Sequence, residues 1–583
     1  MRLVGHFSRV AAIVAAGSVT SAALALNPGE TVDNFRLIDH KGNAQELYYR
    51  SDMKAVVLLT HMNGCDAVKS AAATLASLSS KYPQVEFLML NSNLDNPRDD
   101  IAADAKRLPL DAPIMIDDTQ LVGESLGVKA NGEAFVIASQ AGFKLAYRGD
   151  VNGVAEALDA VIAGKPVAKA VTAANGCAAS FPELAKRDAH AKISYEKTIA
   201  PLLEDKCVAC HREGGIGPWA MSSYEMVKGF APMIREVVRT KRMPPWHVDP
   251  HYGQWANDRG LTVEEAKTLV HWIEAGAPRG TGEDPLKAQK KDWPQWPLGE
   301  PDLVVETPPF TVPATGVIPY QNITIKNPLN EDKWIRAIDY LPGERAVLHH
   351  VIATVGTERF GGTALNNYVP GAEPLILPED TGILLKAGST FHFQLHYTSS
   401  GKELTDSTKF GLYFMDKEPK YHFRSMVLMN PRLKIPAGVK HHVEQAVNTF
   451  RDDAVIYSLH PHAHFRGKSA SFVAKYPDGR EEVLINIPNY DFNWQGTYFL
   501  TEPKTVPAGT QIIYTQVFDN SAQNKANPDP TITVTWGEQT WEEMVFGVVR
   551  WRKVNEDGQP DRFGPSQQEI FESRPPRTSS LTR

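Results

Sequence analysis

The chain has 583 residues, of which 42% are hydrophobic and 22% are charged, and its formal net charge is -7. A chain of this length exceeds what a single hydrophobic core supports, so we expect about three to four domains. It contains no long cluster of lysine and arginine, which excludes the electrostatic footprint of a nucleic-acid-binding protein, and we expect no nucleic-acid partner.

Residues 1–25 have the pattern of a secretory signal peptide. Arg2 and Arg9 precede an apolar run of small residues that ends at Ala25 in the sequence ALA, an A-x-A cleavage site. A short transmembrane anchor is the alternative, but the run is rich in alanine and shorter than the ~20 residues that span a bilayer. We therefore expect an exported protein that keeps no stable membrane anchor after cleavage.

Export permits disulfide bonds, and the chain has four cysteines. They are Cys65, Cys177, Cys207 and Cys210. Because the 373 residues after Cys210 contain none, we expect core packing, not disulfides, to hold that part of the chain together.

Residues 26–165 alternate strand and helix patterns. The apolar runs 54–62 and 85–91 are typical of buried parallel strands, and the segment between them has helical spacing. Three more strand patterns follow, the last two separated by the turn SQAG. This order predicts an α/β sheet covered by helices.

Cys65 follows the first of these strands and opens the helix, where the helix N-terminus stabilises a thiolate. On these residues the segment resembles the thioredoxin/redoxin superfamily, which implies an α/β thioredoxin-like domain with Cys65 at the reactive position. The segment departs from the superfamily because Met62 stands where a second cysteine would be and NGEAFVI lacks a proline. We therefore do not expect dithiol exchange, and two alternatives remain for Cys65: a structural disulfide with Cys177 or a free nucleophile.

Residues 166–190 are rich in alanine and then polar, which predicts a linker, and residues 191–283 have helical patterns. The motif CVACH occupies 207–211. Two thiols at this spacing can form thioether bonds to haem vinyl groups, while His211 supplies an iron ligand. A redox dithiol and half of a zinc site are the alternatives, but the first would not need the histidine and the second would need two further ligands nearby. The motif favours covalently bound haem.

The segment from 261 to 278 resembles the last helix of class I c-type cytochromes, and the block 193–280 resembles that family as a whole. The resemblance implies an all-α cytochrome c domain whose axial methionine lies on a loop before that helix. Met243, in the sequence RMPPW, fits this position. Rival candidates for the sixth ligand are Met221, Met226, Met233, His247 and His271, and we expect Met233 to lie on a helix in the core.

A second linker, 284–300, is rich in proline and tryptophan, and the pattern changes after it. Alternating runs separated by Pro, Gly and Asn turns predict antiparallel β structure. The length favours two sandwiches side by side, which we place at 301–425 and 426–575.

The β part holds ten of the 18 histidines, three of them at alternating positions in LHPHAHFRGK. Residues two apart on a strand point to the same side, so His462 and His464 can reach one metal, although His460 shares that face. Imidazole suits copper, zinc or iron, whereas a thioether favours copper(I), so a histidine pair with a methionine favours copper. Other histidines of this part have the ordinary alternative of a surface or core position; they are His392, His422, His441 and His442.

Four segments, VLHHV, FQLHY, HAHFRGK and EEMVFG, occur in the order in which one family carries its metal ligands. On them the β part resembles the copper type II, ascorbate-dependent monooxygenases that hydroxylate peptidylglycine and dopamine. The resemblance implies two antiparallel, jelly-roll-like sandwiches, each with one copper. The first copper would store and deliver an electron from His349, His350 and His396. The second would activate dioxygen on His462, His464 and Met544, which leaves His460 outside.

The sequence thus predicts an exported copper-dependent monooxygenase that hydroxylates a C–H bond of an unknown small substrate with dioxygen. Its expected cofactors are two copper ions and one covalently bound haem c. The electrons would come from ascorbate or another donor, or through the haem from a redox partner protein. Two alternatives are a non-catalytic periplasmic copper and haem protein, for electron transfer or metal handling, and a thiol-redox protein. The haem motif and the signal peptide indicate a bacterial periplasm.

Overall fold

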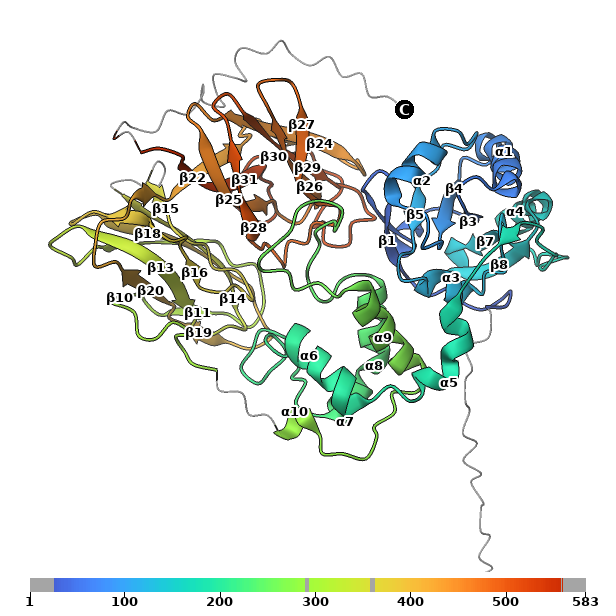
Figure 1. Ribbon diagram of the computed structural model, residues 1–583, viewed down its shortest axis with the longest axis horizontal. Helices are drawn as coiled ribbons and strands as arrows, with labels where there is room; N and C mark the ends of the chain where they lie inside the picture. Colours follow the sequence, from blue (N-terminus) through green and yellow to red (C-terminus); the bar gives the residue numbers. More distant parts are fainter. Residues whose placement is uncertain (1–25, 289–292, 357–361, 557, 559–583) are drawn as a thin grey trace, which may run out of the picture.

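A computed structural model describes residues 26–288, 293–356, 362–556 and 558. The predicted signal peptide and the last part of the predicted second sandwich, 559–575, lie outside these residues. Within the described ranges, no helix is long and apolar enough to cross a membrane. Figure 1 shows an N-terminal α/β region in blue, a helical region in teal and green, and two β regions in yellow and orange.

The N-terminal region is built on one seven-stranded sheet with the order β2-β1-β5-β4-β3-β7-β8. β3 lies parallel to β4 and antiparallel to β7, and β7 forms a hairpin with β8. This is the strand arrangement of a thioredoxin-like fold, so the α/β prediction is confirmed. The strands are β1 Arg36–Asp39, β2 Ala44–Glu46, β3 Ala55–His61, β4 Val85–Asn91, β5 Ile114–Ile116, β7 Ala134–Ala138 and β8 Lys144–Gly149.

Both faces of this sheet are covered, which explains the continuous apolar run in β3. Residues of β3 contribute alternately to two core clusters, with Val57 on one side and Val56 on the other. The helices α1, α2 and α4 pack on the first face, and α3 packs on the second. They span α1 Asp66–Lys81, α2 Arg98–Ala105, α3 Leu121–Leu126 and α4 Val154–Ile162.

The predicted linker 166–190 is docked on the N-terminal region instead of running free. Its short strand β9, Cys177–Ala178, pairs antiparallel with β6, Ala130–Asn131. A 3-10 turn, Pro182–Lys186, and the short helix α5, Arg187–His190, follow. The linker therefore has a fixed path towards the helical region.

The helical region contains α6 Ala200–Lys206, α7 Tyr224–Gly229, α8 Ala231–Arg239, α9 Val263–Glu274 and α10 Pro285–Ala288. Its core includes Trp272 of α9 and also Leu121, which comes from α3 of the N-terminal region. α9 begins with a capping box between Thr262 and Glu265. Met233 lies on α8 as predicted, but its side chain is 53% exposed, so the expectation that it belongs to the core is wrong.

The prediction of β structure after residue 300 is confirmed. In the first β region, 301–425, a six-stranded sheet and the four-stranded sheet β12-β18-β14-β15 share one core. In the second β region, 426–556, the sheets β22-β31-β25-β28 and β24-β29-β26-β27 share another. The strands that carry the candidate site are β14 Leu348–Gly356, β18 Thr390–Tyr397, β25 Ala454–His462 and β31 Phe546–Lys553.

The remaining strands of the first β region are β10 Leu303–Glu306, β11 Phe310–Val312, β12 Gln321–Lys326, β13 Lys333–Leu341, β15 Thr363–Ala364, β16 Leu375–Ile376, β17 Thr381–Leu385, β19 Leu404–Asp406, β20 Lys409–Phe414 and β21 Tyr421–His422. Those of the second are β22 Arg424–Met429, β23 Lys434–Ile435, β24 His442–Thr449, β26 Gly467–Lys475, β27 Glu481–Ile487, β28 Tyr498–Val506, β29 Gln511–Phe518 and β30 Val534–Thr535.

The loop between α8 and α9 joins the helical region to the second β region. Val248 and Trp255 of this loop belong to the core cluster of that β region. The backbone N–H of Asp249 donates to the carbonyl of Asn486 over 2.9 Å. The N-terminal region reaches the same β region through the Tyr49 hydroxyl, which donates to Asp519 over 2.6 Å.

Candidate metal centre

A β-bulge brings three of the predicted ligands together. In the pairing of β14 with β18, Leu348 faces Tyr397 and His350 faces His396, so His349 is the extra residue. Consecutive residues of a regular strand point to opposite sides, but a bulge re-aims one of them. One ligand nitrogen each from His349, His350 and His396 therefore lies within 4.8 Å of the others.

The three imidazoles are buried, between 3% and 8% exposed, and several of their nitrogens lack partners. Nε2 of His349, Nε2 of His350 and Nδ1 of His396 have no hydrogen-bond partner among the described residues. Burial lowers the pKa of His349 to about 4 and that of His396 to about 2, so both imidazoles are neutral at physiological pH. A buried polar atom without a partner is costly, and a metal ion would use these free lone pairs.

The second predicted ligand group lies at the end of β25. His462 is the last residue of this strand and His464 lies two residues beyond its end, so the expectation that one strand carries both is wrong, but their ring centroids still lie 5.2 Å apart. His462 Nδ1 hydrogen-bonds Gln495, and His464 Nδ1 donates to the carbonyl of Glu542 over 3.1 Å. These contacts fix both rings and leave His464 Nε2 buried without a partner.

Glu543 connects this turn to the methionine segment. Its carboxyl accepts the backbone N–H of His464 at 2.8 Å and that of Arg466 at 2.6 Å. It is fully buried, and burial raises its pKa to about 8. Because Met544 is the next residue, Glu543 holds the backbone beside this methionine against the histidine turn. Glu543 is not among the site residues expected from the sequence, although the acid directly before the methionine in EEMVFG is a signal that points to it.

The two ligand groups are neighbours. The ring centroids of His350 and His462 lie 6.2 Å apart, and Phe492 stacks on His349 with a centroid distance of 4.6 Å. His460 donates to or accepts from the Thr497 hydroxyl through Nδ1 at 3.2 Å, and it lines a small cavity together with His350 and His462. Histidines from both β regions thus converge, and His460 lies beside them at the same small cavity.

The haem motif, residues 207–211, directly follows α6. Cys207 and Cys210 are both free, and burial raises the pKa of Cys207 to about 12. His211 is buried and its Nδ1 donates to the carbonyl of Trp219 over 3.1 Å, which leaves Nε2 for a ligand. These residues fit a covalently attached haem.

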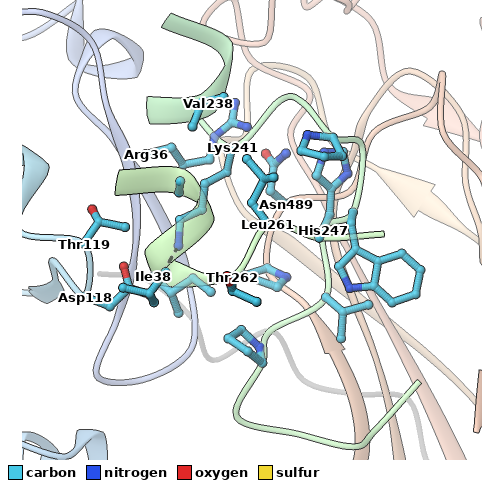
Figure 2. A pocket seen from close by; sticks show the side chains of 18 of the residues that line it. Arg36, Ile38, Asp118, Thr119, Val238, Lys241, His247, Leu261, Thr262 and Asn489 are labelled. Carbon is cyan, nitrogen blue, oxygen red and sulfur yellow. Dashed lines mark ion pairs between the residues drawn. The ribbon is translucent and has the colours of Figure 1, made fainter. Parts of the chain in front are cut away.

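Met243, the predicted sixth ligand of the haem, lines a cavity to which the haem motif does not contribute. Met243 precedes a cis peptide bond to Pro244 and is 41% exposed. It lines a cavity of about 540 Å³ where the N-terminal, helical and second β regions meet, and neither cysteine of the motif nor His211 lines it. Figure 2 shows this cavity with Arg36 from β1, Val238 from α8 and His247 around it.

The rival sixth ligands are spread over the helical region. The backbone N–H of Met221 donates to the carbonyl of His211 over 2.8 Å, so this buried methionine lies beside the motif. Met226 is 38% exposed, and His247 lines the cavity of Figure 2. His271 is engaged with Glu124. The assignment of Met243 stays a prediction.

Cys65 and Cys177 form a disulfide, which confirms that alternative and excludes a free Cys65 nucleophile. Cys65 is buried at the N-cap of α1, and Cys177 lies on β9, whose pairing with β6 docks the linker. The bond closes a sequence separation of 112 residues.

Comparisons with known proteins give little beyond this geometry. No family model matches the chain, and no curated protein matches it. Among solved structures, a hypothetical protein from Sinorhizobium meliloti is 22% identical, covering 27% of this chain and 94% of its own, with a TM-score of 0.25. The peroxidoxin BcpB of Mycobacterium tuberculosis is 20% identical, covering 24% and 97%, with a TM-score of 0.21. A putative thiol:disulfide interchange protein DsbE from Chlorobium tepidum is 14% identical, covering 24% and 99%, also at 0.21. At these TM-scores no activity can be transferred.

Proposed function

We propose that this protein is an exported copper-dependent oxidoreductase of the bacterial periplasm, and more specifically a monooxygenase that hydroxylates a small molecule with dioxygen. The observation that carries the proposal is the gathering of His349, His350 and His396, buried and with unpartnered nitrogens, next to the His462 and His464 pair. Donor sets of this kind suit copper better than zinc or iron when a thioether such as Met544 belongs to one of them.

Copper bound to these residues would supply one-electron storage at the three-imidazole group and dioxygen activation at the group that includes a thioether. The chain itself holds the donors in place. Gln495 fixes the ring of His462, the carbonyl of Glu542 fixes the ring of His464, and Glu543 fixes the backbone of His464 and Arg466. Phe492, stacked on His349, covers one face of that imidazole.

We also propose that the helical region is a c-type cytochrome domain that delivers electrons to this centre. Gly371 of the first β region lies against the haem motif, and a Cβ built on it would be 3.5 Å from the sulfur of Cys210 and in collision with Trp494. Gln495, the ligand-fixing residue, directly follows Trp494. A continuous packed path therefore leads from the haem-attachment cysteine through Gly371 and Trp494 to His462. Ascorbate or a redox partner protein would be the ultimate donor.

Anaerobic titration with copper(I) tests the metal centre. The wild-type protein should bind two copper ions per chain, and Met544→Ala should lose one of them. Met233→Ala, an exposed methionine on α8, is the matched control and should bind as the wild type does. Equal copper content in the Met544 variant and the wild type would remove the thioether site from the proposal.

Stopped-flow spectroscopy of the haem tests the electron path. Dithionite-reduced haem should be reoxidised by dioxygen faster when copper is present, and Trp494→Leu should slow this reoxidation without changing the copper content. If copper has no effect on the rate, the helical region is not a donor to the β regions.

A second candidate function is thiol–disulfide redox chemistry, and the Cys65–Cys177 disulfide favours it. Cys65 stands at the N-terminus of α1, where a helix stabilises the thiolate that reduction would produce. Incubation with reduced glutathione, followed by mass spectrometry of alkylated thiols, tests it. If glutathione leaves the bond oxidised at neutral pH, the disulfide is structural and this candidate fails.

A further inference from the structure

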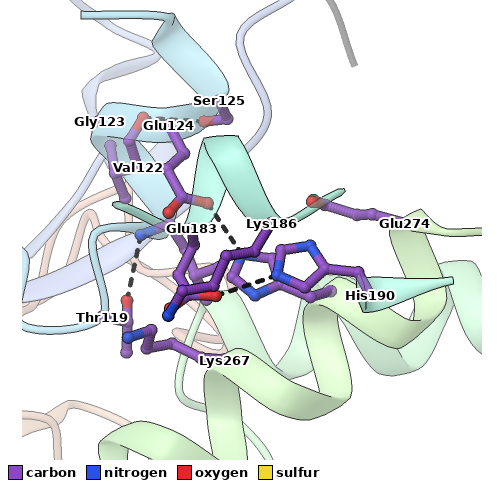
Figure 3. Close-up of polar contacts among 12 residues, drawn as sticks. Thr119, Val122, Gly123, Glu124, Ser125, Glu183, Lys186, His190, Lys267 and Glu274 are labelled. Carbon is purple, nitrogen blue, oxygen red and sulfur yellow. Dashed lines mark hydrogen bonds and ion pairs between the residues drawn. The ribbon is translucent and has the colours of Figure 1, made fainter. Parts of the chain in front are cut away.

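A second cluster of histidines lies where the N-terminal region, the docked linker and the helical region meet. Four side chains contribute from four separate elements: Glu124 from α3, Glu183 from the turn Pro182–Lys186, His190 from α5 and His271 from α9. Figure 3 shows Glu183 directed at the imidazole of His190, with Glu124 nearby. Neither the copper nor the haem proposal uses these residues.

The two imidazoles lie face to face and each meets one carboxylate. Their ring centroids are 4.1 Å apart and the planes differ by 8°. His190 Nε2 is 3.0 Å from Glu183 Oε2, and His271 Nε2 is 2.8 Å from Glu124 Oε2. Ligand atoms of Glu183, His190 and His271 all lie within 4.8 Å of one another.

The cluster is sheltered from water and one of its oxygens has no partner. The side chains of His271 and Glu124 are 5% and 8% exposed, and those of His190 and Glu183 are 12% and 15% exposed. Glu124 Oε1 is buried and accepts no hydrogen bond in the described part of the chain. Leaving a carboxylate oxygen in this state is costly unless a cation lies beside it. Lys186 engages Oε1 of Glu183 at 2.8 Å and leaves Oε2 directed at His190.

We propose that Glu124, Glu183, His190 and His271 bind one divalent cation of the zinc class. Two imidazole nitrogens and two carboxylate oxygens make a complete tetrahedral set for such an ion. At ordinary zinc–ligand lengths, neighbouring ligand atoms of a tetrahedral site are roughly 3.3 Å apart. The contacts of 2.8 and 3.0 Å therefore need to open by only a few tenths of an ångström. Glu124 lies outside the group whose ligand atoms are within 4.8 Å of one another, so its carboxylate has to move towards Glu183 and His190, and the two nearly parallel imidazoles have to tilt so that their lone pairs converge. A metal-bound imidazole carries its proton on the other ring nitrogen, so the proton that each Nε2 shares with its carboxylate leaves that nitrogen when the ion binds.

The ion would clamp three regions of the chain. α3 already contacts the helical region because Arg239 donates to the carbonyl of Leu121 at 3.4 Å and to the Ser125 hydroxyl at 3.0 Å. A cation bound by α3, the linker and α9 together would hold the linker at this contact between the N-terminal and helical regions. The site is structural, since all four ligand positions come from the protein and none is left open for a substrate.

Zinc content measured by elemental analysis, after equilibration with zinc chloride and gel filtration, tests the proposal. The copper groups also take up zinc, so the informative quantity is the difference between proteins treated alike. Glu124→Gln and His190→Asn should each hold one zinc ion fewer than the wild type. The matched control is His251→Asn, an exposed histidine 3.6 Å from Asp99, which should hold as much as the wild type. Equal zinc in the wild type and in both cluster variants would overturn the proposal.

A measurement on the unaltered protein covers the case in which a variant does not fold. Limited proteolysis of the wild type should cleave the linker 166–190 more slowly with zinc than with a chelator, because the ion ties Glu183 and His190 down. His396→Ala, which removes a ligand of the other group, should keep this zinc-dependent protection, so failure of the copper proposal is distinguishable from failure of this one. Identical cleavage with zinc and with chelator would mean that the four side chains are only hydrogen-bonded to each other.

Discussion

The two histidine clusters of this protein differ in what surrounds their imidazoles. In the cluster of the β regions, His349, His350 and His396 lie among one another, with nitrogens that have no partner. In the cluster at the joint of the helical region, His190 and His271 each face a carboxylate. Histidines and carboxylates together are a zinc ligand set, whereas histidines that share a site with a thioether favour copper(I). The residue type beside the histidine, more than the histidine itself, therefore predicts the metal.

The largest expected effect is the loss of copper from one cluster, with zinc kept by the other, when one imidazole is removed. His396→Ala deletes one of three ligands and should abolish copper(I) binding at the three-histidine group, while the zinc content of the joint stays unchanged. Anaerobic copper titration combined with elemental analysis measures both. His442→Ala, a histidine on β24 that hydrogen-bonds Glu444 at 2.9 Å, is the control and should change neither.

Cys177→Ser should weaken the contact between the N-terminal region, the linker and the helical region, and it should leave the histidine cluster of the β regions unchanged. The disulfide holds the linker that carries Glu183 and His190, and its loss should lower the free energy of unfolding of the N-terminal region by about 2–4 kcal/mol. Zinc should then be released more easily, with copper binding unaffected. Chemical denaturation followed by circular dichroism measures the first effect. An unchanged unfolding midpoint would show that strand pairing alone docks the linker.

Glu543→Gln should act on the β cluster alone and more mildly. Glutamine keeps one acceptor but turns its amide towards a backbone N–H, so the turn carrying His464 loses a hydrogen bond. We expect copper affinity at the His462, His464 and Met544 group to fall by roughly 10- to 100-fold, as for other residues that orient metal ligands. Competition with a copper(I) chelator measures it, and the exposed Glu502→Gln is the control.

The smallest expected effect concerns α9. Thr262→Ala removes the capping box at the start of this helix and should cost about 1 kcal/mol of stability. His271 lies in the last turn of the helix, about two and a half turns away, so zinc binding by His271 and its partners should persist. Thermal unfolding measures the stability, and a loss of zinc in this variant would mean that the joint depends on the whole helix.

The strands after residue 300 could be predicted because their signals are local, whereas the grouping of His349, His350 and His396 came from the resemblance to the copper monooxygenases and not from any local signal. The alternating β patterns follow from a strand period of two residues, and the apolar run of β3 follows from burial on both faces. The bulge that turns His349 and His350 to one side has no signal in VLHHV itself. The end of β25 before His464 was equally hidden, because HPHAH continues the alternation past the point where the strand stops.

The joint cluster could not be predicted at all. Glu124, Glu183, His190 and His271 come from four elements whose meeting depends on how the linker docks. Its docking in turn depends on the Cys65–Cys177 bond and on the two-residue pairing of β6 with β9. None of these four residues belongs to a sequence motif, because tertiary packing alone sets the spacing between them.

Val248, Trp255 and Leu121 each pack into the core of a region other than their own. This packing limits how the protein can be divided into fragments. A fragment starting at 301 would leave two holes in the second β region, where Val248 and Trp255 fill its core. A fragment of the helical region alone would lack Leu121. Domain boundaries placed where the residue pattern of the sequence changes therefore cut through shared cores. Fragments made for crystallisation or for building chimeras would need to keep these borrowed side chains, or replace them with apolar residues of equal volume.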